Sequence, residues 1–186
     1  MKKDNGFKNR KGREEKEFEQ SLVDIARVTR VKAGGKRLSF RALIVIGDKK
    51  CRVGAGIGKG KDVATAVEKA VAKAEKNLIK IQIIKGTIAH DIFEKFGASK
   101  VLLKTAKQGR GVIAGGSVRT VLELAGIENV VSKIRGSSSK INNVMATING
   151  LKKMRHIEVK DGEVRNKKRE KRDDVDKEDS SKKREK

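Results

Sequence analysis

The positive charge of this 186-residue chain is concentrated on the segment that must also form its core. The sequence has 47 Lys and Arg against 24 Asp and Glu, a formal charge of +23. Residues 18–156 hold 28 of the basic and 10 of the acidic side chains, a net charge of +18, with nearly all the apolar residues. A folded surface with this charge repels itself unless an anion neutralises it. The chain is therefore expected to bind a polyanion, and nucleic acid is the leading candidate.

The two ends of the sequence differ from the segment between them. Residues 1–17 and 157–186 are rich in charge and lack apolar periodicity, which predicts a disordered basic arm and a disordered charged tail. The single cysteine, Cys51, excludes an intrachain disulfide framework and a cysteine-rich zinc site. No apolar run approaches the ~20 residues that span a bilayer, and the charged N-terminus lacks a secretory signal. These features predict a cytoplasmic protein with no membrane partner.

Hydropathy periods predict three strands and a helix in the first part of the foldable segment. Apolar residues first alternate with a period of two, and they then recur at i, i+3 and i+4. The turn signal Ala33-Gly34-Gly35-Lys36 separates the first two strands. The predicted elements are strands at about 20–32, 37–46 and 51–57, followed by a helix at 63–78. This β-β-β-α unit is expected to end near residue 80.

The second part predicts a further mixed unit, with the order β-β-β-α-β-α. A glycine-rich segment at 109–116 leads into its first helix, which Gly126 is suited to end, and the run Ser137-Ser138-Ser139 offers an N-cap for the last helix. The predicted elements are a strand at 79–84, a hairpin of 87–96 with 101–103, a helix at 118–125, a strand at 129–134 and a helix at 141–151. The fold class is thus α+β, with two small domains at 18–80 and 81–156.

The motifs of nucleotide and metal enzymes are incomplete in this sequence. The run Gly54-Ala55-Gly56-Ile57-Gly58-Lys59-Gly60-Lys61 fits neither the P-loop spacing nor the dinucleotide fingerprint. His90 and His156 lie far apart and lack the neighbours of a zinc site. We therefore expect no enzyme activity, no cofactor, no metal and no small-molecule substrate.

Clusters of basic residues carry the functional prediction. A helix with a basic N-terminus and one basic stripe can lie across phosphates, although Glu68 and Glu75 on the same helix also allow an ordinary solvated face. The net charge of the foldable segment favours phosphate binding. The candidate RNA-binding residues are Arg27, Arg30, Lys32, Gly34, Gly35, Lys36 and Arg37 around the first turn, Arg52, Lys59 and Lys61 near the glycine run, and Lys69, Lys73 and Lys76 on the helix.

Several stretches resemble the family of the bacterial fifth small-subunit ribosomal protein. They are 31–43, 45–48, 52–59 and 111–126, in consistent order over roughly 18–153. The resemblance implies an N-terminal double-stranded-RNA-binding-like β-β-β-α domain and a C-terminal domain with a left-handed β-α-β crossover. It also implies binding to small-subunit ribosomal RNA, contact with ribosomal proteins four and eight of that subunit, and a part in subunit assembly and decoding accuracy.

The resemblance also assigns roles to particular residues. It implies that the loop formed by Lys32, Ala33, Gly34, Gly35, Lys36 and Arg37 lies beside the spectinomycin site. It implies that Gly109, Arg110, Gly111 and Arg119 belong to the contact with protein four. The chain departs from the family in having no proline, since the family usually has proline at the positions of Ala89, Thr105 and Lys140.

Two other hypotheses remain open at the level of sequence. A free duplex-RNA-binding or RNA chaperone module would act on RNA by shape, but it would need only the first domain. A phosphotransferase is conceivable because the second-domain fold type also occurs in some small-molecule kinases, but the incomplete phosphate motifs argue against it.

Overall fold

The computed structural model describes residues 18–155, so the predicted arm at 1–17, the predicted tail at 157–186 and His156 lie outside the described residues. The first half contains β1 (Glu19–Lys32), β2 (Gly35–Gly47), β3 (Arg52–Gly60), α1 (Val63–Lys76) and β4 (Ile79–Lys80). The second half contains β5 (Ile83–Ile84), β6 (Thr87–Ile88), β7 (Ile92–Phe96), β8 (Ser99–Thr105), β9 (Val112–Ile113), α2 (Gly116–Leu124), β10 (Val130–Gly136) and α3 (Lys140–Lys152). The α+β class is as predicted.

The first sheet is antiparallel, has the order β1-β2-β3-β4 and is buried on both faces along β2. Ala42, Ile44 and Ile46 pack with the buried alanines of α1. Leu43 and Val45, which alternate with them, belong to the larger core shared with the second half. The uninterrupted apolar run of β2 is typical of a strand that is covered on both faces.

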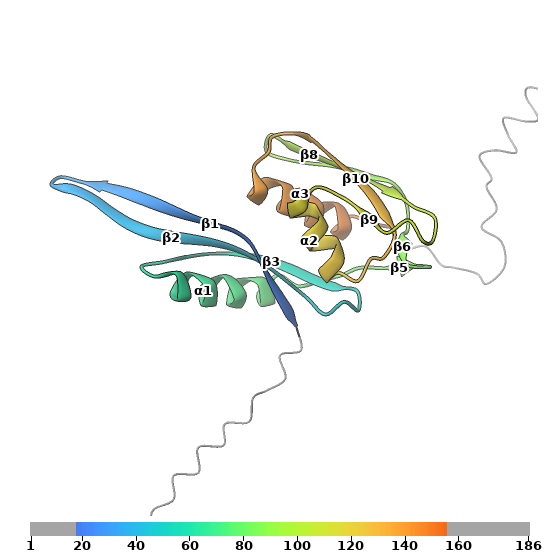
Figure 1. The fold of residues 1–186 in the computed structure, drawn as a ribbon, viewed down its shortest axis with the longest axis horizontal. Coiled ribbons are helices and arrows are strands. Elements are labelled where there is room, and N and C mark those ends of the chain that lie inside the picture. The colour runs from blue at the N-terminus through green and yellow to red at the C-terminus, as the bar shows by residue number, and fades with distance from the viewer. Residues whose placement is uncertain (1–17, 156–186) are drawn as a thin grey trace, which may run out of the picture. The chain divides into compact units, whose positions relative to one another are not determined.

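The second sheet has the order β7-β8-β10-β9, and helices cover one of its faces (Figure 1). Val101 and Leu103 of β8 join one core with Val118 and Leu122 of α2, and this core continues to the first sheet. The layers are therefore α1, the first sheet, α2 with α3, and the second sheet. The parallel pair β9 and β10, joined through α2, forms a β-α-β crossover. That this crossover is left-handed, as the family resemblance implies, stays a prediction.

The glycine run lies inside β3, so the predicted end of this strand at about 57 is wrong. Gly54, Gly56, Gly58 and Gly60 occupy alternate positions of the strand and face α1. A Cβ atom at Gly56 or Gly58 would overlap the carbonyl oxygen of Ala70 or Ala66, respectively. Ala66, Ala70 and Ala74 are fully buried against this surface. Small residues on both elements thus bring the helix backbone directly onto the strand.

Two predicted elements of the second half are wrong in extent. The predicted strand at 79–84 is broken at Ile81, which is buried and whose N–H donates to the Cys51 carbonyl at 2.8 Å. Residues before it pair with β3, whereas β5 pairs with β6 across a turn at Lys85 and Gly86, both at positive φ. The predicted segment 87–96 is likewise divided, and only β7 forms the hairpin with β8. Loop-forming backbone at these turns interrupts an apolar pattern that looks continuous in sequence.

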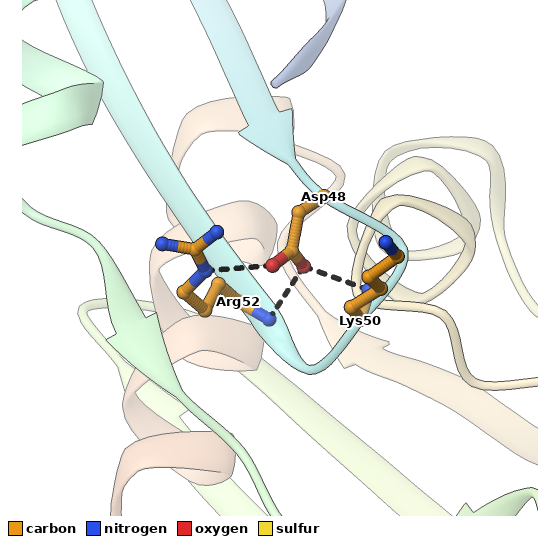
Figure 2. Close-up of polar contacts among 3 residues, drawn as sticks. All are labelled: Asp48, Lys50 and Arg52. Atoms are coloured by element: carbon orange, nitrogen blue, oxygen red, sulfur yellow. Dashed lines mark hydrogen bonds and ion pairs between the residues drawn. The ribbon is translucent and has the colours of Figure 1, made fainter. Parts of the chain in front are cut away.

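The turn between β2 and β3 joins the two halves and is organised by Asp48 (Figure 2). Its carboxylate accepts hydrogen bonds from the Lys50 N–H (2.7 Å), the Arg52 N–H (2.9 Å) and the Arg52 Nε–H (2.6 Å). In the same turn the Lys49 N–H donates to the Leu124 carbonyl at 3.0 Å, and the Cys51 N–H donates to the Ala125 carbonyl at 3.1 Å. Asp48 thus holds the loop that docks on the end of α2.

The ionisation of Asp48 is tied to this turn. Burial alone raises the pKa of the carboxyl. The opposing effects are hydrogen bonds from the Arg52 side chain and from the backbone of Arg52 and Lys50, together with the charge of Arg52. They outweigh burial and hold the pKa below its ordinary value of 3.8. A lowered pKa means that the carboxylate stabilises the folded state above the unfolded pKa. This contribution is lost as the pH falls through the folded pKa.

Replacing Asp48 by asparagine should therefore weaken the fold most at neutral pH. Asp48→Asn keeps the Oδ1 acceptor and removes the ion pair with Arg52. We expect the free energy of unfolding to fall by about 1 kcal/mol at pH 7. The difference from the unchanged protein should shrink as the pH drops below about 4. Urea unfolding across this pH range measures both effects, and a constant difference at all pH values would contradict the assignment.

Candidate nucleic-acid interface

The β1–β2 hairpin projects beyond the rest of the first sheet (Figure 1). β3 pairs with β2 only between Phe40 and Gly47, so the segment 35–39 pairs with β1 alone. Five residues of strand extend about 17 Å. At the tip, no atom lies within 4 Å of a Cβ built on Gly34 or Gly35. The backbone of the turn is therefore open to a ligand.

A groove of about 520 Å³ lies where the hairpin, the end of β3 and α1 meet. Its lining residues are Val28, Thr29, Arg30, Arg37, Ser39, Lys59, Gly60, Lys61 and Lys69. A second hollow, of about 490 Å³, shares Lys59 and Lys69 with it and adds Lys73. We call the two together the basic groove; its six cations are Arg30, Arg37, Lys59, Lys61, Lys69 and Lys73.

The six cations of the basic groove are not neutralised within the described part of the chain. All six are exposed, and no acidic residue is among the residues that line either hollow. None of them forms an ion pair with another residue between 18 and 155. They come from β1, β2, α1 and the end of β3 with the residue that follows it, and only the fold brings these segments together. The arrangement is suited to successive phosphates of a nucleic acid.

Two of these cations oppose each other directly. Arg30 of β1 and Arg37 of β2 are register partners, and both line the groove. Like charges at directly opposite positions of an antiparallel pair are destabilising. The free protein therefore retains a repulsion that a bound anion would relieve.

Other predicted RNA-binding residues lie outside the basic groove. Lys32 lies beyond it toward the tip, whereas the alternation of side chains puts Arg27 and Lys36 on the opposite face of the hairpin. Lys76 lines a different hollow, between the end of α1 and α3. Arg52, at the far end of β3, pairs with Asp48 and lies 4.9 Å from the centre of the Phe18 ring. RNA contact by these residues remains a prediction.

The second predicted set lies at the start of α2. The Arg119 guanidinium donates to the Val112 carbonyl at 2.7 Å and lies 3.5 Å from the Glu123 carboxylate. Its side chain is 52% exposed. Gly109 and Gly111 have positive φ, and the Gly111 N–H donates to the Asn129 side chain at 3.1 Å. The structure thus links Arg119 to the loop that contains Gly109, Arg110 and Gly111.

Sequence reasoning missed two determinants of this architecture. Asp48 was not singled out, although an aspartate at the head of a turn commonly binds backbone N–H groups two residues on. Neither the nucleotide motifs nor the family resemblance indicates that the glycine run packs against a helix. Its period of two, followed by alanines spaced four apart, was the available signal for close strand–helix packing.

Residues 18–155 lack the features of two other kinds of site. They contain no group of three or more His, Cys, Asp or Glu side chains that could hold a metal ion. None of the helices in that range is long and apolar enough to cross a membrane.

The projecting hairpin and the basic groove have the charge and shape typical of a nucleic-acid-binding protein. Residues 18–82 match the family "Ribosomal protein S5, N-terminal domain", and residues 94–167 match "Ribosomal protein S5, C-terminal domain". The chain belongs to the ribosomal protein S5 family. This membership decides against a free RNA-binding module and a phosphotransferase.

Curated relatives support the same assignment. The chain is 50% identical over 138 residues to the small ribosomal subunit protein uS5 of Thermotoga neapolitana, covering 74% of this chain and 78% of that protein. It is 47% identical over 138 residues to the uS5 protein of Thermotoga maritima, with the same coverage. It is 52% identical over 152 residues to that of Mycoplasma mobile, covering 81% of this chain and 63% of that protein.

Proposed function

We propose that the basic groove is the surface by which this chain holds small-subunit ribosomal RNA. As a member of the S5 family, the chain is a structural, non-enzymatic constituent of the small ribosomal subunit in the cytoplasm, and it binds ribosomal RNA. The observation that supports this particular surface is the set of six exposed cations, unpaired among the described residues, that the β1–β2 hairpin, the end of β3 and α1 bring to one groove.

The mechanism is electrostatic and geometric. Lysine and arginine side chains neutralise phosphates and release counterions, which gives affinity, and their fixed positions set the orientation of the RNA. The open backbone at Gly34 and Gly35 lets the hairpin tip approach a phosphate without side-chain obstruction. The shared core between the two halves fixes the groove relative to the second sheet. Holding RNA segments in a fixed relation is how the chain would support subunit assembly.

The helix stripe provides a test with an internal control. Lys69 and Lys73 line the basic groove, whereas Lys76 is also exposed on α1 but lies outside it. We expect Lys69→Gln with Lys73→Gln to lower affinity for small-subunit ribosomal RNA, and to reduce the slope of log affinity against log salt by one to two. Lys76→Gln should change both much less.

RNA titrations at several salt concentrations measure this difference, and thermal unfolding checks that all three variants fold equally well. Equal losses from the groove pair and from Lys76→Gln, measured per charge removed, would reject the groove as the specific surface.

We further propose contacts with ribosomal proteins four and eight of the small subunit, as the family resemblance implies. For protein four, the candidate surface is the loop of Gly109, Arg110 and Gly111 together with Arg119. The half-exposed side chain of Arg119 donates to the carbonyl of Val112, the β9 residue that directly follows this loop, so this arginine can both support the end of the loop and present charge to a partner.

Loosening that contact should affect decoding accuracy. If this interface must open when the small subunit closes on a codon, then weakening the interface favours the closed state. A weakening of ~1.4 kcal/mol would shift the equilibrium between open and closed subunits tenfold. We expect Arg119→Ala to raise stop-codon readthrough without impairing subunit assembly. Glu123→Ala is the matched control, because it removes the ion pair and leaves the bond from Arg119 to Val112. Normal readthrough in cells carrying only Arg119→Ala would exclude this role.

A further inference from the structure

The outer face of the second sheet is a second basic surface. Side chains of a strand alternate between the two faces of its sheet. Ile92, Val101, Leu103 and Val130 belong to the core beneath the helices. The residues between them therefore point away from the helices; they are Phe93 and Lys95 of β7, Lys100, Leu102 and Lys104 of β8, Ile113 of β9, and Val131, Lys133 and Arg135 of β10. We call this set the outer face.

Cations dominate the outer face. Lys95, Lys100, Lys104, Lys133 and Arg135 are all exposed. The four strands of this sheet contain one acidic residue, Glu94, which lies on the opposite face and pairs with Lys153 at 2.7 Å. The outer face therefore carries five positive charges and no negative charge from its own strands.

The register concentrates three of these charges in one row. Lys95 is the partner of Lys100, and Lys100 is the partner of Arg135. Directly opposite side chains on neighbouring strands have Cβ atoms about 5 Å apart, and like charges so placed are destabilising. The same feature, a cross-strand pair of cations, occurs in the basic groove at Arg30 and Arg37. An anion with several closely spaced negative charges would relieve the repulsion within this row.

Two apolar pairs lie on the same face beside this row. Phe93 opposes Leu102, and Val131 pairs with Ile113, while Lys133 and Lys104 are the partners of Leu102 and Val131 between β8 and β10. Phe93 at 56% and Ile113 at 47% are well exposed, whereas Leu102 and Val131 are partly covered. An exposed aromatic ring on a four-stranded sheet, flanked by cations, is an arrangement on which an unpaired base can stack while its phosphates contact the cations.

We propose that the outer face is a second RNA-binding surface, at which phosphates contact the row Lys95, Lys100 and Arg135 and an unpaired base stacks on Phe93. Charge complementarity favours RNA over a protein partner, because the face carries five exposed cations and only two well-exposed apolar side chains. The inference concerns a surface separate from the basic groove, and it does not depend on RNA binding there.

The first test uses the full chain with Lys95, Lys100 and Arg135 each changed to glutamine. Titration with a small-subunit ribosomal RNA transcript should show about a 10- to 100-fold loss of affinity at low salt and a salt slope reduced by about two. The matched control changes three other exposed lysines, Lys50, Lys80 and Lys85, to glutamine. Its loss should be several-fold smaller; an equal loss would reduce the effect to net charge and overturn the proposal.

The second test isolates stacking. With polyuridylate as the probe, Phe93→Leu should lower affinity about fivefold or more, while Phe93→Tyr should retain it. All these positions are exposed, so circular dichroism is expected to show an unchanged fold. Unchanged RNA affinity of the triple variant overturns the proposal. It is also overturned if the triple variant binds RNA normally but small subunits reconstituted with it lose a neighbouring protein, because the face would then bind protein.

Discussion

Replacing Gly58 by valine is expected to unfold much of the protein. A side chain at this position meets the carbonyl oxygen and carbonyl carbon of Ala66 and the N–H of Ala70, all of which belong to the backbone of α1. Backbone atoms of a helix cannot rotate away as a side chain can. The helix must therefore move off β3, and with it the burial of Ala66, Ala70 and Ala74 is lost. We expect a loss of at least about 3 kcal/mol in the free energy of unfolding.

Urea denaturation of Gly58→Val and of the milder Gly58→Ala measures this effect. Gly34→Ala is the matched control, because no atom lies within 4 Å of its added Cβ. The control should fold with unchanged stability, within about 0.5 kcal/mol. If Gly58→Val is as stable as the control, α1 does not lie directly on β3, and the position of Lys69 and Lys73 beside Lys59 must be revised.

The sequence predicts local structure here better than it predicts the packing of layers. Apolar periods indicated the helix that begins at Val63 and the strand that contains Phe40, and both are confirmed. The double-sided burial of β2 was not predicted, because it depends on α2, from a distant part of the chain, packing against the face of β2 that carries Leu43 and Val45. The division into domains at residue 80 stays a prediction, since the described residues of both halves share one core.

The basic groove could be predicted only in part, because it too depends on segments that are distant in the sequence. Separate local patterns predict Arg30, Arg37 and Lys69 as RNA-binding residues, and the fold brings them together. Lys76 was chosen from the same helical pattern as Lys69, yet it lines a different hollow because one helix extends past the end of the groove. Periodicity identifies the face of a helix, but only the neighbouring strand decides which part of that face meets the hairpin.

Two positions where the family usually has proline make specific contacts in this chain. The Thr105 N–H donates to the Asp91 carboxylate at 2.9 Å, a bond that proline cannot make. The Lys140 ammonium donates to Asp24 at 2.9 Å and so ties α3 to β1. These hydrogen bonds supply local order where a proline ring would otherwise restrict the backbone, and neither bond can be inferred from sequence spacing.

Reversing the charge of Arg37 should have opposite effects on stability and on RNA binding. In the free protein Arg37 opposes Arg30, so Arg37→Glu replaces a like-charge pair with an attractive one. We expect the free energy of unfolding to rise by about 0.2–1 kcal/mol. RNA affinity should fall by roughly 10- to 100-fold at low salt, because a phosphate contact is lost and a repulsive charge is added, and the salt slope should decrease by about one.

Lys36→Glu distinguishes the groove from the hairpin as a whole. Lys36 carries the same charge on the opposite face of β2, where its register partner is Val31. If RNA lies in the groove, Lys36→Glu costs less affinity than Arg37→Glu and gives no gain in stability. Thermal unfolding and RNA titration on the same two variants measure both quantities. If Arg37→Glu loses both RNA affinity and stability, then Arg37 supports the fold of the hairpin. The proposal that bound RNA relieves a repulsion between Arg30 and Arg37 would then be wrong.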